Sequence, residues 1–175
     1  MTHTMSLKLL IIGHGRHGKD TVCEILRDKY WVSFESSSRF CSKLFIFNDL
    51  KDKYGYMNEE ECYADRHQHR AEWYNAIVAY NTPDASALGK AIFAEHDIYC
   101  GLRNKKEFFA MQNKGIFDYA IWVDRSEHLP PEDKDSMSLE QWMADYTIDN
   151  NGSLSDLEFN VDALFTHLLK KHPRS

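Results

Sequence analysis

Short cysteine pairs are absent from the sequence, and cysteine itself is scarce. The four cysteines lie far apart, with no Cys-x-x-Cys pair among them: Cys23, Cys41, Cys62 and Cys100. This spacing argues against a zinc knuckle and against a thioredoxin-like redox motif. We therefore interpret these residues as reduced and mostly buried thiols, which is the usual state of cysteine in a cytoplasmic protein.

The sequence also lacks long hydrophobic runs and an excess of basic residues. No apolar run approaches the roughly 20 residues that a membrane-spanning helix needs, and residues 1–5 lack the basic start of a secretion signal. The net charge of -6 argues against a surface that coats nucleic acid, although it leaves room for a local basic pocket. We expect a cytoplasmic protein with no membrane partner and no nucleic-acid partner.

Internal repeats and linkers that would divide the chain are missing too. With 175 residues, of which 43% are hydrophobic and 27% charged, the chain has the size and composition of one folded domain. Predicted strands alternate with predicted helices, the strands lying at residues 7–12, 30–34, 97–100, 117–123 and 146–148. This alternation predicts a single α/β domain over residues 1–175, with an open parallel β-sheet and helices on both faces.

Two segments stand out from this alternation. Residues 58–80 have the pattern of one continuous helix and residues 86–95 that of another. We interpret the stretch of about 58–95 as a helical insertion that binds the substrate. Residues at about 126–138 are polar and acidic and contain two prolines, which is typical of a surface loop or flap.

A glycine-rich turn follows the first predicted strand. Residues 7–12 form an apolar run, which predicts a strand buried on both faces. Residues 13–21 then have the Gly-x4-Gly-Lys spacing of a P-loop, and a helical pattern follows. Glycines let successive N–H groups point inward, and the helix N-terminus adds a partial positive charge. We expect a triphosphate site rather than a turn without a ligand, with contacts from Gly13, Gly15, His17, Gly18, Lys19, Asp20 and Thr21.

Candidate groups for a second phosphate lie further along the chain. Ser37 and Arg39 follow the second predicted strand, where they either cap a helix or face a substrate phosphate. Arg66 and Arg70 lie four residues apart in a predicted helix, so their guanidinium groups share one face. Such a face suits a phosphate dianion, since each guanidinium can bind two oxygens, but it is also typical of a solvated charged surface. Both interpretations stay open for each pair.

These features together resemble those of P-loop nucleoside monophosphate kinases, and above all the deoxynucleoside monophosphate kinases of tailed bacteriophages. Three stretches carry the resemblance: the P-loop with its Gly-Lys-Asp-Thr ending, residues 97–103 with Glu107, and residues 145–153 with the turn Asn-Asn-Gly-Ser. The resemblance implies transfer of the γ-phosphoryl group of ATP to a (deoxy)nucleoside 5′-monophosphate. It also implies ATP and Mg²⁺ as cofactors and, for a phage protein, a location in the host cytoplasm.

The resemblance further implies roles for individual residues. The transfer step would use the P-loop lysine and three arginines: Lys19, Arg16, Arg103 and Arg125. The turn after the last strand would contact the adenine through Asn151, Gly152 and Ser153. The monophosphate side would be lined by Ser37, Arg39, Arg66, Arg70, Trp73 and Glu107. The ring of Trp73 would be free to stack on a base.

The sequence departs from the family's pattern at the expected metal ligands. Asp20 stands where a serine or threonine normally holds Mg²⁺, and Gly101 stands where relatives place an aspartate, two residues before Arg103. We expect phosphate oxygens and water to hold Mg²⁺, with Asp20 or Asp124 in support. Two alternatives stay open, namely a small-molecule kinase of the same fold, similar to dephospho-coenzyme A kinases, and a nucleotide-binding protein with impaired catalysis. The oligomeric state is open as well, with a homodimer as one alternative.

Overall fold

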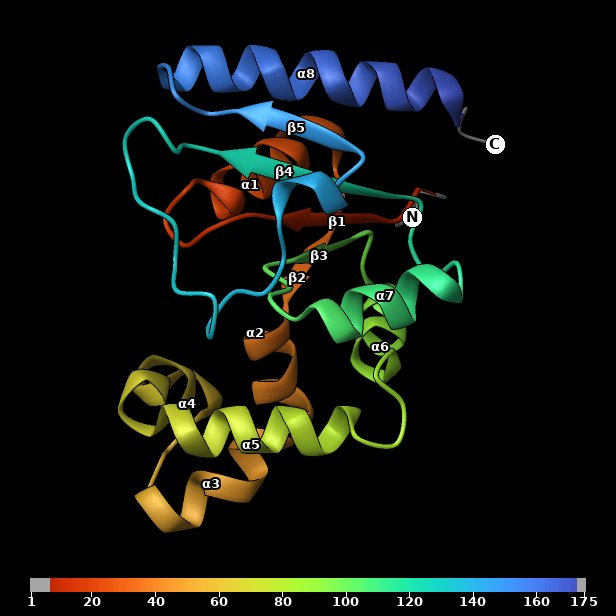
Figure 1. Cartoon of the computed structure of the whole chain (residues 1–175). Coiled ribbons are helices and arrows are strands. Elements are labelled where there is room, and N and C mark those ends of the chain that lie inside the picture. Colours follow the sequence, from red (N-terminus) through yellow and green to blue (C-terminus); the bar gives the residue numbers. More distant parts are fainter. Residues whose placement is uncertain (1–6, 173–175) are drawn as a thin grey trace.

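The computed structural model of the chain describes residues 7–172, and within them five strands form one sheet (Figure 1). The strands lie in the order β2-β3-β1-β4-β5, and every pairing is parallel. Their bounds are β1 Leu9–Ile12, β2 Phe34–Ser36, β3 Ile98–Cys100, β4 Tyr119–Asp124 and β5 Tyr146–Asp149. The expected open parallel sheet is therefore confirmed, while the expectation about residues 1–5 lies outside the described residues.

Strand β1 lies at the centre of the sheet and is buried on both faces, as its apolar run predicts. Leu10 lies opposite Tyr99 of β3 and Ala120 of β4. Leu10 belongs to the hydrophobic cluster on one face of the sheet, and Leu9 belongs to the cluster on the other. Because parallel strands end at the same edge of a sheet, the segments that follow β1, β3 and β4 gather there.

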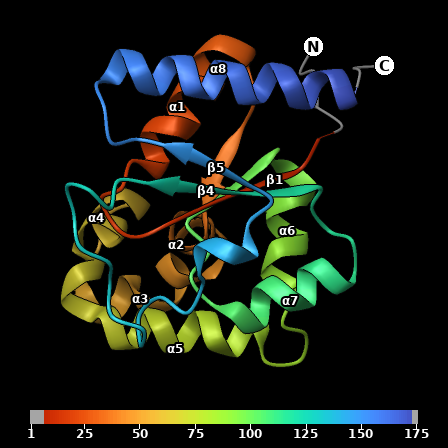
Figure 2. The ribbon, with the colours of Figure 1, turned by 45° about the horizontal axis from the view of Figure 1, so that its top comes forward.

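Helices cover both faces of the sheet (Figure 2). One face is covered by α1 (Lys19–Tyr30) and α8 (Leu154–Lys171), whose apolar residues share a cluster with Leu9. The other face is covered by α6 (Ala87–Glu95) and α7 (Lys105–Asn113), which contribute to the cluster of Leu10. Within residues 7–172, no helix has the length and the apolar character that a bilayer crossing requires.

A helical segment follows β2 and lies beyond the sheet, at the bottom of Figure 1. It consists of α2 (Ser37–Cys41), a π-helical turn (Ser42–Ile46), α3 (Phe47–Tyr54), α4 (Glu59–Ala64), a 3-10 turn (Asp65–His69) and α5 (Arg70–Asn81). The predicted insertion, 58–95, thus includes α4 and α5. Its last residues form α6, which packs on the sheet itself.

The helix expected over residues 58–80 is interrupted, which corrects that expectation. Asp65 Oδ2 accepts a hydrogen bond from the Tyr56 hydroxyl at 2.7 Å and lies 3.1 Å from His69 Nε2. The His69 ring also stacks on Tyr54, with 3.9 Å between the ring centroids. These side-chain contacts hold a 3-10 turn between α4 and α5, although the apolar periodicity continues through it.

The second strand begins later than the sequence predicts. A run of aromatic and β-branched residues favours a strand at 30–34, but Tyr30 ends α1. Trp31 then takes a left-handed backbone conformation, with φ of 58°, and its N–H donates to the carbonyl of Arg27. The helix cap therefore uses the residues that were expected to start the strand, and β2 starts at Phe34.

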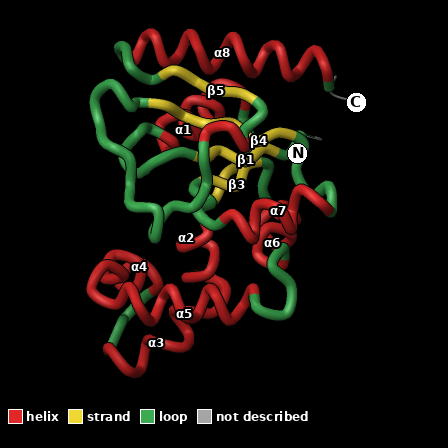
Figure 3. Tube along the Cα trace, viewed as in Figure 1, coloured by secondary structure: helices red, strands yellow, loops and turns green. Residues whose placement is uncertain are grey.

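The longest irregular segment among residues 7–172 joins β4 to β5. It runs past the carboxyl ends of the strands (Figure 3) and includes the expected flap, residues 126–138. Before β5 it forms a 3-10 turn at Gln141–Met143. Apart from its 3-10 turn, this segment has no regular secondary structure, and its second half packs into the core through Met137, Leu139 and Met143.

The burial of β1 gives a test of the core. Leu10 is 0% exposed, whereas Leu154 at the start of α8 is 61% exposed. Leu10→Ala should lower the free energy of unfolding by about 2–5 kcal/mol, because the lost methyl groups leave a cavity in a packed core. Leu154→Ala should change it by less than about 0.5 kcal/mol. Urea denaturation followed by circular dichroism measures both values, and equal effects would contradict the described packing.

Candidate active site

Two glycines shape the turn after β1. Gly13 has φ of 146°, and a Cβ there would lie 2.6 Å from the carbonyl oxygen of Val123 in β4. Gly18 has φ of 99°, and a Cβ there would collide with the side-chain amide of Asn150. Both backbone conformations favour glycine over residues with a side chain. The turn expected to be a P-loop thus fits closely between β4 and the residues that follow β5.

Lys19 is the first residue of α1, and its side chain folds back over the turn. Its ammonium group donates a hydrogen bond of 2.8 Å to the carbonyl oxygen of His14. Burial, and after it the positive charge of Arg103, lower the pKa of Lys19. The N-terminus of α1 adds a partial positive charge at the same place. The turn therefore gathers positive charge next to backbone donors, as phosphate binding requires.

Asn150, the first residue of the Asn-Asn-Gly-Ser turn that was expected to contact adenine, connects the P-loop to the sheet. Its side-chain amide donates a hydrogen bond of 2.9 Å to the carbonyl of His17, and its backbone N–H donates one of 2.8 Å to the carbonyl of Asp124. Its own carbonyl accepts a hydrogen bond of 2.6 Å from the Arg125 guanidinium. The guanidinium of Arg125 thereby lies at this corner, and its backbone N–H donates to His17 of the P-loop.

The other turn residues after β5 are engaged in local hydrogen bonds. Ser153 caps α8 by accepting from Asp156 N–H at 3.1 Å, and Gly152 lies next to the same aspartate. Asn151 accepts the Glu127 N–H through its side-chain oxygen at 3.0 Å. The turn expected to contact adenine therefore holds the start of the flap.

Two histidines hold the flap, residues 126–138, against the P-loop. His17 is 1% exposed; its Nδ1 accepts the Arg125 N–H at 3.0 Å, and its Nε2 faces the Pro130 carbonyl at 3.4 Å. His14 Nδ1 accepts the Glu132 N–H at 3.1 Å. Burial, and after it the neighbouring His17, lower the pKa of His14. Each ring therefore accepts a main-chain N–H of the flap or of its start through Nδ1, and His17 Nε2 faces a main-chain carbonyl of the flap.

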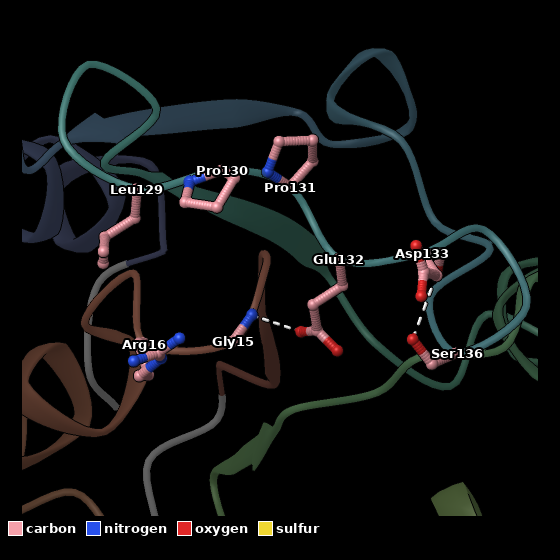
Figure 4. A pocket seen from close by; sticks show the side chains of 8 residues that line it. All are labelled: Gly15, Arg16, Leu129, Pro130, Pro131, Glu132, Asp133 and Ser136. Atoms are coloured by element: carbon pink, nitrogen blue, oxygen red, sulfur yellow. Dashed lines mark hydrogen bonds between the residues drawn. The ribbon is translucent and has the colours of Figure 1, made fainter.

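The carboxylate of Glu132 lies in the mouth of the P-loop (Figure 4). One of its oxygens accepts the Gly15 N–H, and the other accepts a hydrogen bond from the Arg103 guanidinium. Burial opposes ionisation, but the hydrogen bond and charge of Arg103 outweigh it and lower the pKa of Glu132. Nothing in the sequence signals this contact, since Glu132 is one acidic residue among several in a polar loop. An anion is thus accommodated between a P-loop amide and an arginine.

A pocket opens beside this carboxylate. It has a volume of about 420 Å³ and lies between the P-loop and the flap, lined by Gly15, Arg16, Leu129, Pro130, Pro131, Glu132, Asp133 and Ser136. Arg16 has a left-handed backbone conformation, with φ of 64°, and its side chain is exposed at the pocket. The structure thus brings Lys19, Arg16 and Arg103 to one place.

The two carboxylates expected to support Mg²⁺ lie on opposite sides of β1. Asp20 accepts a contact of 3.5 Å from the Cys100 thiol at the end of β3, whereas Asp124 at the end of β4 accepts the Ser126 N–H at 2.9 Å. Among residues 7–172, no group of three or more His, Cys, Asp or Glu side chains could hold a metal ion. Asp20 and Thr21 in the first turn of α1 remain the oxygen donors beside the P-loop lysine, and the two aspartates do not form one site.

The continuous helix expected to align Arg66 with Arg70 is interrupted, since Arg66 lies in the 3-10 turn and Arg70 begins α5. Arg66 lies over the Tyr63 ring at 3.9 Å and donates to the Tyr63 carbonyl at 2.9 Å. Arg70 is exposed and lies 3.4 Å from His67 Nδ1. Arg39 also lies over the Tyr63 ring, with 4.5 Å between its guanidinium carbon and the ring centroid. Arg39 and Arg66 therefore both contact the Tyr63 ring.

Trp73 is buried, which corrects the expectation that its ring is free to stack on a base. It is 5% exposed and packs in the core with Tyr63 edge-on at 6.3 Å. Arg39, another residue expected to bind the monophosphate, forms an ion pair of 3.1 Å with Glu59. Ser36, rather than Ser37, caps α2 by accepting the Arg39 N–H at 3.2 Å.

Glu107, from α7, contributes a second unusual carboxyl group. It accepts a hydrogen bond of 2.8 Å from the Asn81 side chain, and burial raises its pKa to about 7. Its charge helps to raise the pKa of the buried Tyr99, after the larger effect of burial, and the Tyr99 hydroxyl is hydrogen-bonded to Ser37. Ser37 and Glu107 therefore share a polar group of side chains at the ends of β2 and β3.

No family model matches the sequence, and no curated protein matches it. Solved structures do match the fold. A shikimate kinase from Aquifex aeolicus has a TM-score of 0.54 at 13% identity, over 97% of this chain and 100% of that one. TT1252 from Thermus thermophilus has a TM-score of 0.52 at 18% identity, over 93% of this chain and 97% of that one.

A shikimate kinase from Acinetobacter baumannii, solved in complex with shikimate, has a TM-score of 0.51 at 10% identity, over 96% of both chains. The strand order, the glycine-rich turn and these similarities show the fold alone: the chain has an α/β fold that matches that of P-loop kinases. Two of the three structures described above are shikimate kinases, and the chain is similar to them in fold. The finer resemblance to bacteriophage enzymes depends on sequence motifs alone.

The raised pKa of Glu107 predicts a pH-dependent stability. The carboxyl has an ordinary pKa of 4.5 and a folded-state pKa of about 7, so the folded state binds the proton more tightly. The stabilisation is therefore complete below pH 4.5 and is lost as the pH rises through about 7. At about 1.4 kcal/mol per pKa unit, the loss should approach roughly 3 kcal/mol.

Glu107→Gln removes the titration while leaving an acceptor for Asn81. The free energy of unfolding of the wild type, minus that of the variant, should fall between pH 5 and pH 8. Urea denaturation across this range measures the difference at each pH. A difference that stays constant would show that the Glu107 carboxyl is not shifted by burial.

Proposed function

We propose that this chain transfers the γ-phosphoryl group of ATP to a small acceptor, in the first place a (deoxy)nucleoside 5′-monophosphate. The observation that carries the proposal is the convergence of the Gly15 N–H and the Arg103 guanidinium on one anionic group in the mouth of the P-loop. One donor belongs to the turn after β1 and the other follows β3. That is where a phosphoryl group passing between two substrates needs donors.

The groups present suit the chemistry of this transfer. Phosphoryl transfer needs little covalent help from a protein, and positioning and charge stabilisation supply most of the rate. Lys19 and the P-loop amides would hold the ATP phosphates, while Arg16 and Arg103 would gather the charge of the transferred group. Mg²⁺, beside Asp20 and Thr21, would neutralise charge on the phosphate oxygens.

Fewer of the residues expected to bind the acceptor are available for a nucleoside monophosphate than the sequence suggests. Ser37 and Arg39 follow β2, and Glu107 lies close to Ser37 through Tyr99. A carboxyl with a pKa of about 7 can donate or accept a hydrogen bond at neutral pH, which suits the edge of a base. The sequence resemblance to bacteriophage kinases adds independent support for this acceptor.

A second candidate is a kinase that phosphorylates an alcohol or another small phosphate acceptor, similar to dephospho-coenzyme A kinases. The observation in its favour is that two residues expected to bind the monophosphate contact other parts of the protein instead. Trp73 is buried, and Arg39 is paired with Glu59. The likeness to shikimate kinases concerns the fold alone, and it does not decide between these acceptors.

Lys19→Ala tests the proposal. The variant should lose at least about 100-fold in kcat/KM, since it removes a full charge from the phosphates in a water-poor site. Its melting temperature should change little, because the lost hydrogen bond to His14 contributes only about 1 kcal/mol. ADP formation from ATP and Mg²⁺, with a panel of (deoxy)nucleoside monophosphates and small alcohols as acceptors, measures the effect.

Lys29→Ala is a matched control on the same helix. Lys29 lies in the last turn of α1, where it pairs with Asp162 at 2.7 Å near the surface. This variant should keep its activity. Turnover with alcohols only would favour the second candidate, and ATP binding without turnover on any acceptor would indicate a catalytically impaired nucleotide-binding protein.

A further inference from the structure

The phosphate-binding groups of the site are already engaged by a carboxylate of the same chain. Glu132 takes the Gly15 N–H on one oxygen and the Arg103 guanidinium on the other. A carboxylate resembles one face of a phosphate group in this respect, since both present two oxygens that share a negative charge. The donors that the proposed reaction would use for phosphate are thus occupied by a side chain.

The flap backbone on both sides of Glu132 is hydrogen-bonded to residues outside the flap, and these bonds position the Glu132 side chain. Its own N–H donates to His14 at 3.1 Å, and two residues earlier the Pro130 carbonyl faces His17 at 3.4 Å. At the end of the flap, the Ser138 N–H donates to the Arg103 carbonyl at 2.9 Å. The backbone on both sides of Glu132 is therefore attached to the same loops that its carboxylate contacts.

The middle of the flap, residues 129–136, has few other restraints, because the remaining contacts lie at the two ends of the flap: Asn151 accepts the Glu127 N–H, and Met137 is buried in the core. Among the described residues of the flap, 126–138, none lies in a helix or strand, and Pro130, Pro131 and Asp133 are exposed. Segments with few buried apolar contacts and exposed backbone open at low cost compared with the core. The contacts of Glu132 and the two histidines therefore hold the middle of the flap, and a ligand that takes over the partners of Glu132 would loosen this part alone.

We infer that Glu132 is an autoinhibitory group that occupies the place of a nucleotide phosphate until a polyphosphate displaces it. The inference rests on the proposed function, because it assigns the same donors to ATP. Displacement would free both the Gly15 N–H and Arg103 at once. The flap would then be released from the P-loop only when a phosphate takes over its bonds.

Glu132→Gln tests this inference, because the amide keeps the size of the side chain and removes the negative charge. ATP binding measured by calorimetry should tighten about tenfold, which corresponds to about 1.4 kcal/mol. Asp135→Asn is the matched control, since Asp135 is an exposed carboxylate of the same flap and its substitution removes the same charge. Its dissociation constant for ATP should stay within about twofold of the wild type.

Hydrogen exchange gives a second measurement that does not depend on affinity. The Gly15 amide and residues 126–138 should exchange faster in Glu132→Gln than in the wild type. ATP added to the wild type should speed exchange in the flap while protecting Gly15. Thermal melting and a further variant, Glu132→Ala, check that the result does not come from loss of the fold.

The outcomes separate this inference from the proposed function. Equal or weaker ATP binding by Glu132→Gln, with turnover intact in the wild type, would overturn the inference and leave the kinase proposal standing. Weaker binding would mean that Glu132 supports the bound nucleotide. ATP binding by neither protein would contradict both proposals.

Discussion

The hydrogen bond from the Asn150 side chain to the His17 carbonyl holds the site in place. It is buried, it measures 2.9 Å, and it joins positions 133 residues apart in the sequence. A buried carbonyl left without a donor costs about 1–3 kcal/mol, so the amide fixes the P-loop against the residues after β5. The geometry that phosphate binding depends on is thus set by the far end of the chain, where Asn150 also accepts the Arg125 guanidinium.

The features that the sequence predicts well are those with local causes. The apolar run at β1 can only be buried, and the glycine spacing after it allows few backbone conformations, so strand and turn follow from neighbouring residues. The parallel sheet follows from the alternation of such segments. The interruption at Asp65–His69 does not, because it depends on a contact between His69 and Tyr54 that periodicity cannot show. The argument that Arg66 and Arg70 share one helical face loses its basis for that reason.

Burial and long-range contacts account for the remaining differences. Trp73 follows a helical pattern that fits an exposed ring equally well, and only the packing of Tyr63 against it shows that it belongs to the core. Glu132 contacts Gly15 across 117 positions, and neither residue type signals the other. A glutamate in an acidic loop is typically solvated. Its importance here comes from the arrangement of His14 and Arg103 around it, which only the folded chain provides.

The Glu132 carboxylate also bears on the stability of the protein without nucleotide. Lys19 and Arg103 lie close enough for Arg103 to lower the pKa of Lys19, and the start of α1 adds to the positive potential. A carboxylate between Gly15 and Arg103 offsets this repulsion. Under the inferred autoinhibition, a ligand that displaces the carboxylate would have to supply at least the same negative charge to these donors. The triphosphate of ATP would supply more, so the same positive charge that Glu132 offsets would favour its replacement by a polyphosphate.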